Sequence, residues 1–149
     1  MKIGYLENDG SSMYKVRYLE EYENHEIWHS DDFRDVMSWL EFDPGADAFG
    51  ALMFDLVLPS DSLRLIERNA PKYEEKIHYS PSLYFIKEYL LKKFPQMKDR
   101  IILCSAHFKV VEQKGCNLDD YLKMDKNSPH MADELVSMLR ELEERHNGR

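Results

Sequence analysis

The chain has 149 residues, which suits one domain, and 43% of them are hydrophobic, which is enough for a substantial core. Its formal net charge of -8 argues against direct binding to nucleic acid or to an anionic membrane surface, because both need basic residues. No apolar run approaches the about 20 residues of a membrane span, and the N-terminus lacks the apolar region of a signal peptide. The two cysteines show no disulfide framework and no metal-ligand spacing, so we expect a cytoplasmic protein.

Short apolar runs alternate with helical patterns along the chain, which is typical of a parallel α/β sheet. The predicted strands are residues 2–6, 25–28, 49–54, 100–104 and 118–124. The predicted helices cover about 11–22, 31–40, 60–66, 81–94, 108–113 and 129–142, with a frayed tail after them. This alternation predicts a flavodoxin-like, doubly wound five-stranded parallel sheet with three α/β/α layers.

Capping and breaking residues mark several predicted boundaries. Ser30-Asp31 is expected to cap the second helix, and Asp43-Pro44-Gly45 to end it. Residues 60–79 are largely polar and are interpreted as an insertion into a single domain spanning 1–149.

Polar residues stand at the ends of four predicted strands. Right-handed crossovers place the C-terminal ends of parallel strands at one edge of the sheet, so these residues should converge there. They are Glu7, Asn8 and Asp9 after the first strand, Asp55 after the third, Ser105 after the fourth, and Lys123 with Lys126 near the end of the fifth.

These residue types suit the transfer of a phosphoryl group to a carboxylate, which yields an acyl phosphate. Mg²⁺ prefers carboxylates, carbonyls and water, so Asp55 together with Glu7, Asn8 or Asp9 could hold this ion. A lysine ammonium can pair with phosphoryl oxygens as a point charge. A serine hydroxyl can hydrogen-bond another of those oxygens.

Four segments, in order, resemble the response-regulator receiver domains of two-component systems. Residues 3–9 resemble the family's apolar strand that ends in an acidic cluster. Residues 54–59 match the phosphoacceptor signature, in which Pro follows Asp55 by four positions. Residues 101–106 match the strand that ends in Ser-Ala, and residues 119–123 resemble the segment with the switch aromatic and the lysine.

The resemblance implies that Asp55 accepts a phosphoryl group from a sensor histidine kinase or a phosphotransfer protein. The domain's own catalysis would then be limited to self-phosphorylation and self-dephosphorylation, with no output domain following residue 149. The resemblance also implies a Mg²⁺ site, whose ligands would be Glu7, Asn8, Asp9, Asp55 and the backbone carbonyl of Val57.

A phosphorylation-dependent switch is also implied by the resemblance. Ser105 and Tyr121 would change the surface of the fourth helix, fifth strand and fifth helix, and so change binding to a downstream protein target. That surface could also support a homodimer. Either Lys123 or Lys126 would serve as the lysine of the site.

Two other functions stay open. The Glu7-Asn8 pair and the position of the lysines also suit a pseudo-receiver, which is a phosphorylation-independent interaction module of the same fold. A phosphatase of the haloacid-dehalogenase type also uses a nucleophilic Asp with Ser and Lys at strand ends. That family has an acid two residues after the nucleophile, usually on the first strand, whereas here Val57 follows Asp55 on the third.

Overall fold

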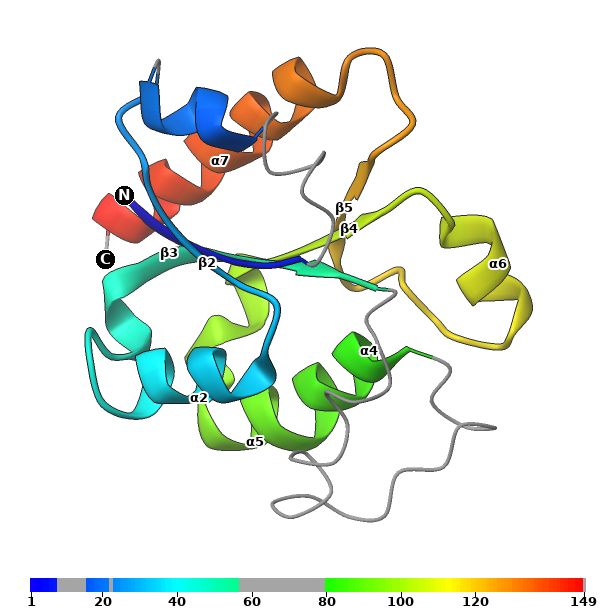
Figure 1. Ribbon diagram of the computed structural model, residues 1–149, viewed down its shortest axis with the longest axis horizontal. Coiled ribbons are helices and arrows are strands. Elements are labelled where there is room, and N and C mark those ends of the chain that lie inside the picture. Colours follow the sequence, from blue (N-terminus) through cyan, green and yellow to red (C-terminus); the bar gives the residue numbers. More distant parts are fainter. Residues whose placement is uncertain (8–15, 22, 57–79, 149) are drawn as a thin grey trace.

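The computed structural model describes residues 1–7, 16–21, 23–56 and 80–148. Within them, five parallel strands form one sheet in the order β2-β1-β3-β4-β5 (Figure 1). The strands are β1 (Lys2–Leu6), β2 (Glu26–Ser30), β3 (Phe49–Asp55), β4 (Ile101–Ser105) and β5 (Leu122–Asp125). The predicted flavodoxin-like, doubly wound sheet is therefore confirmed.

Burial of the central strands explains the apolar runs in the sequence. Strands β3 and β4 are buried along their whole length, and β1 is buried from Ile3 onward. Near-continuous apolar sequence is the pattern of parallel strands that are covered on both faces. The edge strands β2 and β5 are more exposed, and each has a single buried position, Ser30 in β2 and Met124 in β5.

Helices cover both faces of the sheet (Figure 1). The helical segment 16–21 and α7 (Met131–Asn147) pack on one face. The other face carries α2 (Phe33–Glu41) and a helical run made of α4 (Pro81–Phe85), the π-helical turn η3 (Ile86–Leu90) and α5 (Leu91–Lys93). Helix α6 (Phe108–Gln113) follows β4, and the short 3-10 helices are η1 (Ala46–Ala48) and η4 (Pro95–Arg100).

The cap of α2 differs from the prediction by one or two residues. The Asp32 carboxylate, not Ser30-Asp31, accepts a hydrogen bond from the backbone N–H of Arg34 at 2.8 Å. The hydroxyl of Ser30 instead donates to Asp35 Oδ2 at 2.6 Å. Asp32 is the residue directly before the first helical position, so it alone has the geometry of an N-cap.

The start of the last strand was predicted too early. Residues 118–121 form a turn before β5: Asn117 Oδ1 accepts from the backbone N–H of Asp119 at 3.0 Å, and the N–H of Tyr121 donates to the Leu118 carbonyl at 3.2 Å. An Asn side chain that bonds to the backbone two residues ahead favours a turn over a strand, and this preference prevails here.

Helix α7 also departs from the prediction, since it begins at Met131 and continues to Asn147 through the tail expected to fray. An ion pair between Arg145 and Glu141, one turn apart, accompanies this extension. The predicted helix at 60–66, the whole predicted insertion at 60–79 and the start of the first helix lie outside the described residues. No described helix is long and apolar enough to span a bilayer.

Candidate functional site

Two carboxylates meet where the direction of the sheet's connections reverses, between β1 and β3. Leu6 is paired with Phe54 across these strands, so the residues that follow them, Glu7 and Asp55, lie side by side at the C-terminal edge. Glu7 is fully buried and Asp55 is 7% exposed. In doubly wound sheets, ligands bind at this reversal point beyond the strand ends.

Lys126 joins the two carboxylates. Its Nζ lies 3.1 Å from Oδ2 of Asp55 and also pairs with Oε2 of Glu7, and its side chain is only 12% exposed. The residue is held just beyond β5 because its backbone N–H donates to the Ser105 carbonyl at 3.0 Å. Burial lowers the pKa of Lys126, but the hydrogen bond to Glu7 and the nearby charges outweigh it and raise the pKa above its usual value. The ammonium therefore stays charged.

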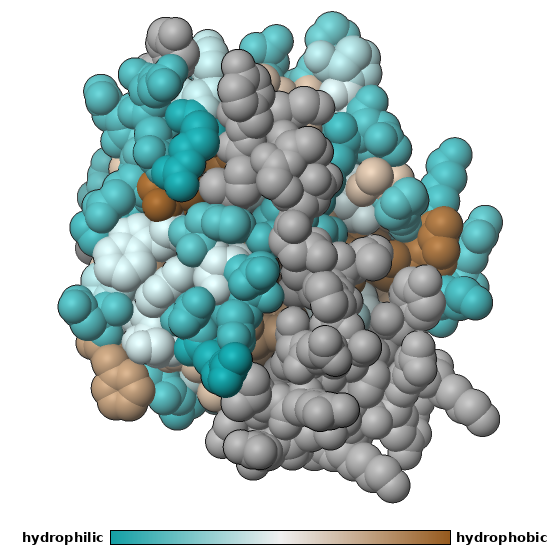
Figure 2. All heavy atoms as spheres, in the orientation of Figure 1, coloured by the Kyte–Doolittle hydropathy of each residue, from teal (hydrophilic) through white to brown (hydrophobic). Residues whose placement is uncertain are grey.

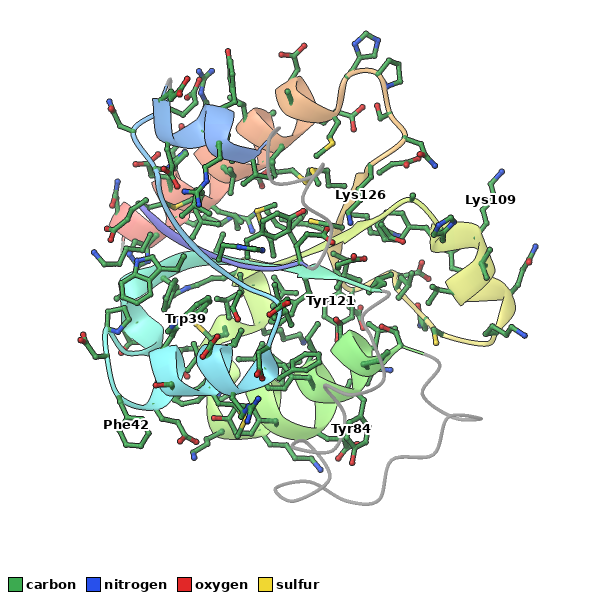
Figure 3. All side chains as sticks on the ribbon, in the orientation of Figure 1. Trp39, Phe42, Tyr84, Lys109, Tyr121 and Lys126 are labelled. Atoms are coloured by element: carbon green, nitrogen blue, oxygen red, sulfur yellow. The ribbon has the colours of Figure 1, made fainter. Side chains whose placement is uncertain are left out.

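The other predicted lysine and the predicted switch aromatic lie elsewhere. Lys123 is an exposed residue within β5, and Tyr121 comes before the first residue of that strand. Figure 3 shows Tyr121 and Lys126 toward opposite ends of β5. Tyr121 lines a surface pocket with Arg145 and neighbouring residues. The structure thus brings Lys126 to Asp55, whereas Tyr121 is remote, and a switch role for Tyr121 stays a prediction.

Ser105 reaches the same edge of the sheet. It is the last residue of β4 and follows Cys104, which is the register partner of Asp55. Its side chain is buried, and Oγ accepts a hydrogen bond from the backbone N–H of His107 at 2.9 Å. Its predicted role in sensing phosphorylation is not tested by this geometry. Burial raises the pKa of the Cys104 thiol well above its usual range, so this neighbour stays protonated.

Sequence reasoning missed two neighbours of Glu7. The Tyr5 hydroxyl donates to Glu7 Oε2 at 3.0 Å, and His29 Nε2 donates to the Glu7 backbone carbonyl at 2.7 Å. Burial, followed by the charges of Cys104 and Glu7, raises the pKa of Tyr5, so its hydroxyl keeps the proton that it donates. Tyr5 could have been found, since residues two apart on a strand share a face. His29 could not, because its position requires the β1–β2 register.

The two carboxylates of the site are groups of the kind that bind a divalent cation. Glu7 and Asp55 converge on one ammonium, so formally two carboxylates face a single positive charge and a further cation would still be attracted. Carboxylate oxygens are what Mg²⁺ prefers, so these two residues fit the ion. Asn8, Asp9 and Val57, the other predicted ligands, lie outside the described residues. Among residues that are described, no group of three or more His, Cys, Asp and Glu could hold a metal ion.

No protein-family model and no curated protein matches the sequence. Several solved structures match along almost their whole length. A two-component response regulator from Legionella pneumophila is 13% identical, with a TM-score of 0.63 over 97% of this chain and 98% of that one. The signal receiver domain of an HD domain-containing protein from Pseudomonas fluorescens Pf-5 is 11% identical, with a TM-score of 0.64 over 99% and 98%. This chain has the fold of response-regulator receiver domains.

A response regulator receiver domain protein from Clostridium thermocellum has the same fold, at 15% identity and a TM-score of 0.56 over 98% of this chain and 96% of that one. At such identities the likeness concerns the fold, and the receiver-like site has to be argued from this chain's own residues. Those residues are Glu7, Asp55 and Lys126, at the reversal point of the receiver fold, with Ser105 at the same edge.

Proposed function

We propose that this protein is a receiver domain that accepts a phosphoryl group on Asp55 from a histidine kinase or phosphotransfer protein. The proposal rests on one observation: the Lys126 ammonium lies 3.1 Å from the Asp55 carboxylate, at the end of the central strand β3. An aspartate held beside a fixed cation at the C-terminal edge of a doubly wound sheet suits attack on an anionic group. The receiver fold and the motif around Asp55 support the same function.

In the proposed reaction, an oxygen of the Asp55 carboxylate forms a bond to phosphorus while the P–N bond of a phosphohistidine donor breaks. The electron pair of that bond goes to the imidazole nitrogen, which takes a proton from solvent water and leaves as neutral imidazole. Asp55 becomes an acyl phosphate. The Lys126 ammonium pairs with phosphoryl oxygens as a point charge, and the Ser105 hydroxyl hydrogen-bonds another of them.

Glu7 and Asp55 would hold Mg²⁺ in this reaction, with Asn8, Asp9 and the Val57 carbonyl as the further ligands that the motif implies. When bound, the ion would neutralise negative charge on the phosphoryl oxygens. Glu7 is fully buried, and burial of a carboxylate is costly unless donors surround it. Tyr5 and Lys126 are such donors.

Binding to a downstream protein, in the cytoplasm, would be the output of this site. The backbone N–H of Lys126 donates to the Ser105 carbonyl, so Lys126 links the ends of β4 and β5. A shift of its ammonium toward a phosphoryl group would therefore change the conformation of the surface next to these strand ends. Figure 2 shows hydrophobic side chains in the region of α6, where Val110 is 42% exposed. The surface of α6, β5 and α7 is therefore the proposed partner site.

The test is the intact mass of the protein after incubation with acetyl phosphate and Mg²⁺. Wild type and Asp125→Asn, which changes an exposed aspartate at the end of β5, should gain a phosphoryl adduct that EDTA prevents. Asp55→Asn should gain none.

If wild type stays unmodified where a known receiver is labelled, the proposal fails and the phosphorylation-independent module is favoured. Turnover of a generic phosphomonoester would favour the phosphatase instead.

A further inference from the structure

We infer that Tyr5 is a positioning residue, which sets the carboxylate of Glu7 for the cation and for Lys126. The inference rests on the proposed function, because it names a residue that prepares the same site. Among the described residues, Tyr5 donates its hydrogen bond to Glu7 and makes none with Asp55. It acts through Glu7.

The contact between Tyr5 and Glu7 is wholly internal. Both residues are 0% exposed, and the phenol hydroxyl donates to Oε2 of the carboxylate at 3.0 Å. The same oxygen accepts from the ammonium of Lys126. Two donors that arrive at one oxygen from different elements fix the direction in which the carboxylate points.

The backbone of Glu7 is fixed independently of its side chain. Its N–H donates to the Ser30 carbonyl at 3.0 Å, and its carbonyl accepts from His29 Nε2 at 2.7 Å. Both partners belong to the edge strand β2. With the main chain held in this way, the freedom that is left to Glu7 is the rotation of its side chain. Tyr5 and Lys126 restrict that rotation.

Loss of the Tyr5 hydroxyl should therefore loosen the carboxylate and leave the rest of the site in place. Groups that orient a ligating side chain typically contribute 10–100-fold to metal affinity, so Tyr5→Phe is expected to weaken binding of a divalent cation by about 10-fold. The substitution keeps the ring and its packing in the core.

The chain offers a matched control. The hydroxyl of Tyr89 donates to Oε1 of Glu41 at 2.7 Å, which is the same pair of groups on the face covered by α2 and η3. Tyr5→Phe and Tyr89→Phe each remove one tyrosine–glutamate hydrogen bond from a largely buried tyrosine. Only the first of them touches a residue of the site.

The experiment is a titration of the 149-residue protein with Mn²⁺, with the free ion measured by electron paramagnetic resonance. Melting curves of both variants are recorded beside it. We expect weaker Mn²⁺ binding in Tyr5→Phe and wild-type binding in Tyr89→Phe, although both should melt below wild type.

The inference is overturned by equal Mn²⁺ affinities in wild type and Tyr5→Phe, or by equal weakening in both variants. Wild-type protein that binds no Mn²⁺ also overturns it, since Glu7 then has no cation to be positioned for. Failure of Tyr5→Phe alone to fold would show a structural role instead of a positioning one. Labelling of Asp55 by acetyl phosphate is scored separately, so the proposed function can fail while the Tyr5 effect on Mn²⁺ stands, and the reverse.

Discussion

Removing the ammonium of Lys126 should destabilise the fold more than any other single lysine substitution among the described residues. Lys126 is the cation beside a fully buried Glu7 and a nearly buried Asp55. Deleting one partner of a buried ion pair leaves uncompensated buried charge, and the typical cost is about 3–5 kcal/mol. We expect Lys126→Gln to lower the free energy of unfolding by about 3 kcal/mol, at the lower end of that range, because 12% of the side chain meets solvent.

Two other lysines provide matched controls for the loss of one positive charge. Lys123→Gln changes an exposed residue in β5, so its effect should stay within about 0.5 kcal/mol. Lys93→Gln breaks an ion pair with Glu41 in which the lysine side chain is 53% exposed, and pairs of this kind are typically worth about 0–1 kcal/mol. The expected order of destabilisation is therefore Lys126, then Lys93, then Lys123.

The assay is urea unfolding at pH 7 in EDTA, followed by tryptophan fluorescence, since Trp28 and Trp39 pack against the core on the α2 face. A loss below about 1 kcal/mol in Lys126→Gln would refute the reasoning, because it would equate this buried contact with a surface pair. A double-mutant cycle with Glu7→Gln should show a coupling energy between the two residues. Mg²⁺ should offset part of the loss in Lys126→Gln, because it returns a cation to the carboxylates.

Three further predictions concern other residues. Burial and the Met1 amine lower the pKa of His25, so the unfolded chain takes up its proton more readily. Stability should thus fall as the pH drops below about 6.5, and His25→Gln should flatten that fall in urea titrations run at several pH values. Asp32→Ala removes the α2 cap and should cost about 1 kcal/mol in the same assay. Cys104, which is buried, should react with a thiol reagent only upon unfolding, whereas the partly exposed Cys116 should react in the folded protein.

The doubly wound parallel sheet could be predicted because the apolar runs of β1, β3 and β4 indicate buried parallel strands that alternate with helices. The beginning of β5 could not, since Leu118 and Tyr121 look like strand residues while Asn117 bonds to the backbone and forms a turn. The end of β5 matters more for function. The strand stops at Asp125, so Lys126 follows it at the edge of the sheet that carries Asp55, whereas Lys123 lies within the strand.

Burial of Glu7 explains why the site depends on the whole sheet. A carboxylate without exposure to solvent needs donors, and neighbours along the same strand can supply only some of them. Here Tyr5 from β1 and Lys126 from just beyond the edge strand β5 donate to the carboxylate, while His29 from the other edge strand β2 donates to the backbone carbonyl of Glu7. The side chain and the main chain of Glu7 therefore keep these partners only when both edge strands are docked. Any change that releases β5 from β4 should also release Lys126 from Glu7 and Asp55, which links the outer surface of the domain directly to the proposed phosphoacceptor.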